Sequence, residues 1–216
     1  MTHPYWPLWD LVVRTPRLEL RLPDDDQLDA LAALAAAGVH DPSEMPFSIP
    51  WTDKPSPLLE RGVLQWNWRQ RAEWAPENWS AGFVVLVQGE PVGAQDLRGP
   101  TFAEDRVVSS GSWLGRAFQG QGLGKEMRAA MLHFAFAGLG AVRAESGAWE
   151  DNARSIAVST ALGYEIVGSK IEPRRGQPAR QLEFALSRKR WEANRRDDIA
   201  IEGLEACLEL FGAVTG

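Results

Sequence analysis

The sequence predicts an α+β fold, in which a mixed and mostly antiparallel sheet is flanked by helices. Three segments between residues 80 and 114 have strand character and are separated by turn signals, which is typical of antiparallel neighbours. A glycine-rich loop then leads into a segment whose large apolar residues recur at helical spacing. One crossover helix after three antiparallel strands indicates the α+β plan.

The N-terminal part begins with an arm, residues 1–11, whose aromatic side chains we expect to pack on another part of the protein. Leucines alternate with polar residues over 14–22, which predicts one strand. Pro23 and the aspartates after it provide a turn and a helix cap, and leucines then recur at helical spacing to about Ala37.

Residues 38–57 contain five prolines and many polar side chains, so we expect an irregular excursion over the core. A second helix is predicted over 58–74 and carries Trp66, Trp68 and Trp74. These tryptophans either fill the core or a dimer seam, or give an acceptor pocket a rigid apolar lining.

The rest of the chain supplies most of the sheet. Strands are predicted over 80–87, 91–97, 106–114, 141–149, 164–171 and 181–187, and the last two pair as a closing hairpin. Asn152 is a good N-cap for a short helix over 153–162, and Gly163 suits the position after its C-cap. From Asp198, apolar residues at helical spacing predict an amphipathic tail helix docked on the core or on a second subunit.

Length and composition indicate an ordinary globular chain. The 216 residues suit a single domain, 1–216, with a core over 12–190, the N-terminal arm and a helical tail over 191–216. The lone Cys207 allows no intrachain disulfide, which suits a reducing cytoplasm. With three scattered histidines and one cysteine, we expect no metal site.

Charge and apolar runs argue against two classes of partner. The sequence has no run of about 18 apolar residues and no basic segment followed by an apolar one, so we expect neither a membrane span nor a signal peptide. A net charge of −6 argues against a general nucleic-acid binder. An acidic surface mildly favours a cationic acceptor such as an amine.

The glycine loop is suited to binding an anion. Glycines at 120, 122 and 124 remove the Cβ atoms that would keep a ligand from the backbone, and the first N–H groups of the next helix have no intrahelical partner. A Walker loop would need Ser or Thr after its lysine, but Glu126 follows Lys125. A dinucleotide loop would need glycine at 125 and a place in the first βαβ unit.

Gln119, Gly122 and Gly124 meet the pattern Q/R-x-x-G-x-G/A, which resembles the acyl-CoA pyrophosphate loop of the GNAT N-acetyltransferase superfamily. The segment D-N-A-R-S-I-A-V-S-T-A-L-G-Y at 151–164 resembles the RimJ/RimL-type branch, typified by the ribosomal-protein N-terminal acetyltransferases. The opening R-T-P-R-L-E-L-R is also similar to that branch. The resemblance covers 14–187, about four fifths of the chain, and leaves both ends outside.

The resemblance implies a site for acetyl-CoA in a sheet that is splayed between the strands at 106–114 and 141–149. It places the pantetheine arm between these strands and directs the backbone N–H of Leu114 toward the thioester oxygen, where it can hold an oxyanion. Asn152 and Ser155 match positions that contact CoA, although Asn152 is also explained as a plain N-cap. The resemblance places the pyrophosphate on backbone amides of the loop residues Gln119, Gly120, Gln121, Gly122, Leu123 and Gly124.

Two departures from the family pattern concern proton transfer. Ser159 stands where many relatives have a tyrosine that donates a proton to the departing thiolate, and Val108 stands where others have a glutamate base. Glu145, Asp96 and Glu172 are candidate bases, but each is better explained as structural or solvated. We therefore expect that holding amine and thioester in line supplies most of the rate.

The resemblance implies an acetyl-CoA-dependent N-acetyltransferase that acts by direct transfer in a ternary complex. The acceptor is a primary amine: a protein N-terminus, a lysine or a small amine. The absent tyrosine and glutamate keep open a non-catalytic CoA-binding sensor or scaffold, and an unrelated nucleotide-binding domain is a more distant alternative. The tryptophan-rich helix and the tail helix are compatible with a homodimer.

Overall fold

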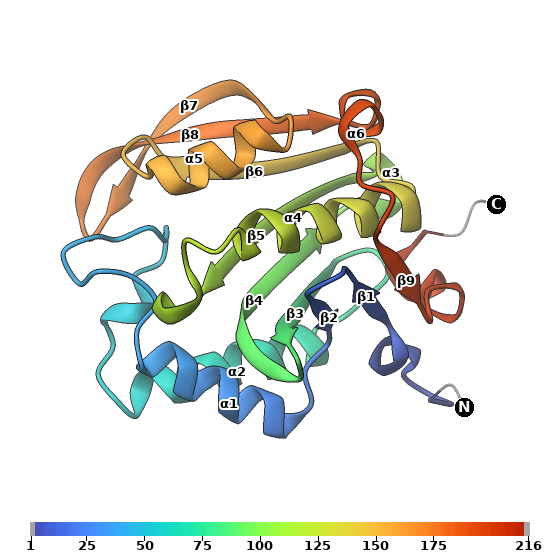
Figure 1. The fold of residues 1–216 in the computed structure, drawn as a ribbon, viewed down its shortest axis with the longest axis horizontal. Coiled ribbons are helices and arrows are strands. Elements are labelled where there is room, and N and C mark those ends of the chain that lie inside the picture. Colours follow the sequence, from blue (N-terminus) through green and yellow to red (C-terminus); the bar gives the residue numbers. More distant parts are fainter. Residues whose placement is uncertain (1–2, 214–216) are drawn as a thin grey trace.

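The computed structural model describes residues 3–213, which form one twisted sheet covered by helices on both faces (Figure 1). The nine strands in this part of the chain lie in the order β7-β8-β6-β5-β4-β3-β2-β1-β9. Only the β5–β6 pair is parallel. The strands are β1 (Val12–Arg14), β2 (Glu19–Arg21), β3 (Trp79–Val87), β4 (Glu90–Gly99), β5 (Val107–Leu114), β6 (Arg143–Trp149), β7 (Glu165–Arg174), β8 (Gln177–Ser187) and β9 (Ala200–Glu202). The predicted α+β plan is confirmed.

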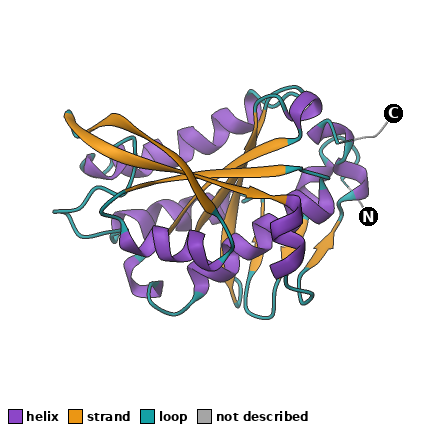
Figure 2. Cartoon of the chain, turned by 90° about the horizontal axis from the view of Figure 1, so that it is seen from above, coloured by secondary structure: helices purple, strands orange, loops and turns teal. Residues whose placement is uncertain are grey.

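The helices lie on the two sides of the strands, as Figure 2 shows from above. None of those within residues 3–213 is long and apolar enough to cross a membrane. They are α1 (Asp25–Ala36), α2 (Leu58–Ala72), α3 (Phe102–Asp105), α4 (Leu123–His133), α5 (Ala153–Ala161) and α6 (Arg188–Asn194). Short 3-10 turns occur at Pro7–Asp10, Trp51–Asp53, Arg116–Phe118, Glu205–Cys207 and Glu209–Phe211, and a π turn at Phe134–Gly138 extends α4.

Strand β3 contributes to a separate core on each face of the sheet. Phe83 and Val85 pack in the larger cluster, with α4, and Val84 and Leu86 pack in the smaller one, with α1 and α2. Because side chains alternate between the faces of a strand, the two clusters lie on opposite sides of the sheet. Two-sided burial explains the continuous apolar run F-V-V-L in this strand.

Strands β5 and β6 form a wedge. They pair over only three positions, from Val107–Arg143 to Ser109–Glu145. Beyond that point β5 stays paired with β4 as far as Leu114, and β6 stays paired with β8 as far as Trp149. The predicted splay between these strands is therefore confirmed.

The prediction of one strand over 14–22 was wrong. Residues 12–21 form a tight antiparallel hairpin of β1 and β2, in which Val13 lies opposite Leu20. Thr15 closes the turn, because its N–H donates to Leu18 O (2.9 Å) and its Oγ1 accepts from Leu18 N (3.0 Å). The leucine pattern correctly marked the buried face, but Pro16 lies in the turn rather than in a strand.

The predicted tail helix was also wrong. The tail instead adds β9 to the sheet edge beside β1 and continues in two 3-10 turns. Gly203 interrupts the helical pattern: its φ is +72°, and a Cβ there would collide with the carbonyl oxygen of Asp10. Cys207 and Phe211 are fully buried in the larger core, so the tail docks on its own chain.

The aromatic residues have separate environments. In the N-terminal arm, Trp6 packs on Trp74, whereas Tyr5 is 87% exposed, so only part of the predicted packing occurs. In α2, Trp66 lines the groove described below and Trp68 is exposed on the surface. Because the tail docks on its own core, it no longer supports the expected homodimer. The exposed residues of α2 still support it.

Candidate functional site

The wedge opens into a groove of about 2380 Å³. The glycine loop lies at its wide end, α4 and α5 border it on one side of the sheet, and the segment after α1 borders it on the other (Figure 1). The predicted site residues that line it are Leu114, Gln119, Gly120, Gly122, Gly124, Asn152 and Ser155. The structure therefore brings together residues that are up to 41 positions apart in the sequence (155 − 114).

The glycine loop presents a row of free amides. Within the described residues, the backbone N–H groups from Gly120 to Lys125 donate to no other group, and the next amide, that of Glu126, donates to Gly122 O. Gly120 and Gly122 have φ values of +74° and +78°, which favour glycine. A row of free N–H groups at the positive end of α4 is suited to a diphosphate.

Gln119 has a different role from the rest of the loop. Its N–H already donates to Arg116 O (3.3 Å), so this amide is not free as those of Gly120 to Lys125 are. Its side-chain Nε2 donates to Leu114 O (2.9 Å) and Val39 O (2.6 Å), and its Oε1 accepts from Arg154 (3.2 Å). Gln119 thus holds the loop against the end of β5.

The end of β5 offers backbone donors to the wedge. Gly115 N–H donates to Val92 O, on the β4 side (3.0 Å). Because N–H groups alternate in direction along a strand, those of Leu114 and Ser112 point to the side that β6 has left. This orientation is compatible with the oxyanion role expected of Leu114.

Asn152 caps α5, because its Oδ1 accepts from Ser155 N–H (3.1 Å). Both residues are half-buried and line the groove. The plain N-cap interpretation is therefore correct, and it leaves the amide nitrogen of Asn152 available to a ligand.

Ser159 is not poised to act alone. Its side chain is 1% exposed, and its Oγ accepts a hydrogen bond from Arg128 Nη1 (3.0 Å). Arg128 also donates to Ser146 Oγ on β6 (2.8 Å). The sequence analysis did not identify Arg128, and a single arginine in a helix gives no local signal for such a contact.

The candidate bases are all paired. Glu145 pairs with Arg143 (3.0 Å), Glu172 pairs with Lys170 (3.5 Å), and Asp96 pairs with Arg98 and also accepts from Gly111 N–H. Val108, where other members have glutamate, is 1% exposed in the core. Asp96, with its side chain 11% exposed, is held in a structural contact, whereas Glu145 and Glu172, at 45% and 43%, form solvated surface pairs.

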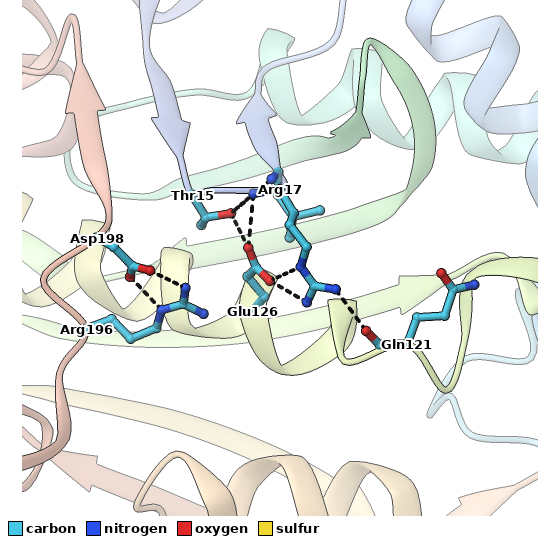
Figure 3. A network of polar contacts seen from close by, with 7 residues as sticks. Thr15, Arg17, Gln121, Glu126, Arg196 and Asp198 are labelled. Atoms are coloured by element: carbon cyan, nitrogen blue, oxygen red, sulfur yellow. Dashed lines mark hydrogen bonds and ion pairs between the residues drawn. The ribbon is translucent and has the colours of Figure 1, made fainter.

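A buried carboxylate anchors the glycine loop from behind (Figure 3). Glu126 is 4% exposed and accepts from Thr15 Oγ1 (2.6 Å) and Arg17 Nε (2.7 Å). Arg17 Nη1 continues to Gln121 O (3.1 Å). The opening R-T-P-R segment is therefore tied to the loop.

The ionisation of Glu126 follows from these contacts. Burial acts to raise the pKa of the carboxyl, but the hydrogen bonds from Thr15 and Arg17 and the charge of Arg17 outweigh it and hold the pKa below its usual value. The anchor is thus an ionised carboxylate at neutral pH.

The 38–57 excursion forms the other wall of the groove and is clamped to the β7–β8 hairpin. Arg175, at the hairpin turn, donates to Asp53 (2.6 and 2.8 Å) and to Pro42 O (3.1 Å). Gln181 Nε2 donates to Ser48 Oγ (3.0 Å). The irregular excursion is therefore held in place by residues more than 120 positions away.

Aromatic rings line this wall. Phe47 and Trp51 lie with ring centroids 5.1 Å apart, and Trp51 lies 5.7 Å from Trp113 of β5. Together they give this wall of the groove a rigid apolar surface. The sequence analysis did not identify Arg128, Arg175 and Glu126. Each of these residues acts through contacts with residues that are distant in the chain.

No group of three or more His, Cys, Asp or Glu side chains within residues 3–213 is arranged to hold a metal ion. The site that this part of the chain does offer consists of backbone amides, hydroxyls, arginines and aromatic rings.

Comparisons with known proteins agree with this geometry. The acetyltransferase (GNAT) domain family matches residues 17–165. Among solved structures, Mycobacterium smegmatis RimJ in complex with CoA-disulfide has a TM-score of 0.69 at 20% identity and covers 93% of this chain and 94% of its own. RimL, the ribosomal L7/L12 alpha-N-protein acetyltransferase in complex with coenzyme A, has a TM-score of 0.66 at 19% identity, covering 82% and 97%. A GCN5-related N-acetyltransferase from Brucella melitensis has a TM-score of 0.65 at 19% identity, covering 84% and 80%. These structures share the fold, and the match over 17–165 shows that the chain belongs to the GNAT family of N-acetyltransferases.

Proposed function

We propose that the protein transfers an acetyl group from acetyl-CoA directly to a primary amine within a ternary complex. The wedge is the observation that carries this proposal: β5 and β6 separate after Ser109 and Glu145, and the free amides of 120–125 stand at its wide end. Such a site can bind a diphosphate at the loop and admit the attached pantetheine between the strands. The proposed contacts are those with the amides of Gly120, Gln121, Gly122, Leu123 and Gly124, with Asn152 and Ser155, and with Leu114 N–H.

Positioning is proposed to supply most of the rate. The amine must be neutral to attack, and the nearby carboxylates Glu145 and Asp96 are both paired with arginines. Alignment of two bound reactants lowers the barrier without a dedicated base. The likeness to RimL favours a protein N-terminus as acceptor, and lysines and small amines belong in the same assay.

Calorimetry with acetyl-CoA, followed by an assay of CoA-thiol release with a panel of amines, tests the proposal. Steady release that requires an amine supports it. Binding of acetyl-CoA without release under any amine supports the non-catalytic alternative, which the absence of a tyrosine at 159 and of a glutamate at 108 suggests. Absence of binding overturns both.

A further inference from the structure

Arg128 is a buried cation without a carboxylate partner. It is 7% exposed, and none of the ion pairs formed within residues 3–213 includes it. A guanidinium keeps its charge in proteins, and burying an unpaired charge is costly. A structure that retains such a group has a use for its charge.

Arg128 lies at the narrow end of the wedge. It extends from α4 to Ser146, the first residue of β6 after the last β5–β6 pair, and to Ser159 of α5. Both partners are neutral hydroxyls, which accept two of the five N–H donors of a guanidinium. Arg128 also lines the groove, so the remaining donors can reach a bound molecule.

A second buried polar group lies beside it. Tyr164 is 5% exposed, and its hydroxyl forms no hydrogen bond of normal geometry within the described residues, although Ser110 and Arg128 lie close to it. The guanidinium carbon of Arg128 is 5.5 Å from the centre of the Tyr164 ring. Burial raises the pKa of Tyr164, and the charge of Arg128 and polar contacts with Ser110 and Arg128 only partly oppose that effect. The two groups make the narrow end of the wedge polar, and Arg128 is the one of the two that lines the groove.

The layout leads an extended ligand from the loop to this place. Gly122 and Arg128 are six residues apart on α4, about 9 Å along the helix axis. From Leu114 back to Ser110, β5 spans about 13 Å. An arm that starts at the glycine loop and follows β5 past Leu114 therefore brings its far end, the thioester of acetyl-CoA, toward Arg128. With the thioester there, a β5 amide further along the wedge, such as that of Ser112, holds the thioester oxygen in place of Leu114, whose N–H is left to bind the arm.

We propose that Arg128 stabilises the thiolate of coenzyme A as it leaves, in place of the proton donor that Ser159 does not supply. This inference rests on the proposed function. The amine nitrogen forms a bond to the carbonyl carbon, the C–S bond breaks, and its electron pair stays on sulfur. The proton of the cationic amine passes to water in the groove. The guanidinium supplies charge and no proton.

Other charged groups near the wedge are engaged elsewhere or lie at its rim. Asp96 and Glu145 each form an ion pair with an arginine. Further ionisable groups of the groove include Lys125 of α4, Arg154 of α5 and Glu183 of β8, and Tyr164, before β7, packs against Arg128. Arg128 differs from these groups because it donates hydrogen bonds to Ser146 of β6 and to Ser159 of α5, on the two sides of the narrow end.

Binding of coenzyme A and of S-methyl-coenzyme A, measured by calorimetry as a function of pH, tests the inference without turnover. The two share the diphosphate and differ at sulfur, and an ordinary thiol ionises near pH 8.5. A cation close to sulfur should lower the ionisation midpoint of the bound thiol by about 1 to 3 pH units. Coenzyme A should then gain about 10- to 1000-fold over S-methyl-coenzyme A as the pH rises toward the midpoint of the free thiol.

Arg128→Met should abolish that gain, slow acetyl transfer by about 10- to 1000-fold and leave the affinity for S-methyl-coenzyme A unchanged. Arg128→Lys should keep part of the gain, because it preserves the positive charge. This variant is used for the test if Arg128→Met fails to fold. Arg190→Met, an arginine of α6 outside the groove, is the matched control and should keep all of it.

Equal weakening of both ligands in Arg128→Met would mean that the arginine holds the diphosphate, which overturns the inference. The inference also fails if both ligands bind the wild-type protein with a ratio that does not change with pH, and the proposed function then survives. If neither coenzyme A nor S-methyl-coenzyme A binds the wild-type protein, the proposed function itself is overturned.

Discussion

Replacing Glu126 with glutamine removes the charge that anchors the glycine loop while preserving the shape of the side chain. The carboxylate accepts from Thr15 Oγ1 and from Arg17 N and Nε, at 2.6, 3.3 and 2.7 Å. A hydrogen bond to a charged group contributes about 1.5 to 3 kcal/mol. The Arg17 side chain is 49% exposed, so water replaces part of what it loses. We expect Glu126→Gln to lower the free energy of unfolding by about 1 to 3 kcal/mol.

Thermal and denaturant unfolding measure this loss. For a chain of this size each kcal/mol corresponds to about 2 to 4 °C in Tm. Glu104→Gln, at an exposed position on α3, is the matched control and should unfold as the wild type does. Because Arg17 also binds Gln121 O, the Gln variant should in addition bind acetyl-CoA more weakly than the control.

The same anchor predicts a pH dependence of the free energy of unfolding. The pKa of Glu126 in the folded protein lies below its usual value of 4.5. The ionised carboxylate therefore stabilises the fold fully above pH 4.5, and its contribution is lost as the pH falls through the lowered pKa. The difference between wild type and Glu126→Gln should shrink in that acid range. A difference that stays constant from about pH 3 to 7 would refute the reasoning.

Three further predictions concern the groove and the core. Gly124→Val should weaken acetyl-CoA binding at least about tenfold, seen by calorimetry, because a side chain on the first turn of α4 fills the space beside Leu114 and the diphosphate. Arg175→Ala should raise the KM for the acceptor by less than about tenfold and leave the Tm unchanged, because the contact with Asp53 is exposed to water; a lower Tm would show that the clamp is structural. Cys207 is fully buried, and burial and the nearby Asp10 raise its pKa to about 11. It should therefore resist alkylation in the folded protein and react once the chain unfolds, and rapid labelling of the native protein would contradict the docked tail.

The parts that could be predicted from the sequence are those fixed by local chemistry. The glycine loop needs positive φ at Gly120 and Gly122, and Asn152 caps α5 through its own next turn. Such features involve residues close in the chain, so a short pattern contains the necessary information. The splay of β5 from β6 came from the resemblance, because no residue in either strand marks the point of separation.

The two errors have different causes, a distant contact in the tail and an unrecognised turn in 14–22. The tail has helical spacing, but Gly203 passes against the backbone of Asp10, and its positive φ ends β9 and leads into the 3-10 turns. In 14–22 the alternation of leucines correctly identified the buried face, but it could not show that the turn at Thr15 and Pro16 divides it into two strands. Tertiary context overrode local pattern in the tail, whereas in 14–22 a local turn, closed by the hydrogen bonds between Thr15 and Leu18, was missed.

Arg128 shows why the replacement of a catalytic group escapes sequence analysis. A missing tyrosine at 159 is visible at once, since the family pattern specifies one position. What stands in its place comes from α4, 31 positions earlier, and reaches Ser159 and Ser146 only because two elements converge on the narrow end of the wedge. A donor of protons and a fixed positive charge stabilise the same leaving thiolate by different means, so a fold can exchange one for the other without preserving the residue or its position. The family pattern therefore shows only that the tyrosine at 159 is missing. It does not show that Arg128, on another helix, supplies a charge near the sulfur.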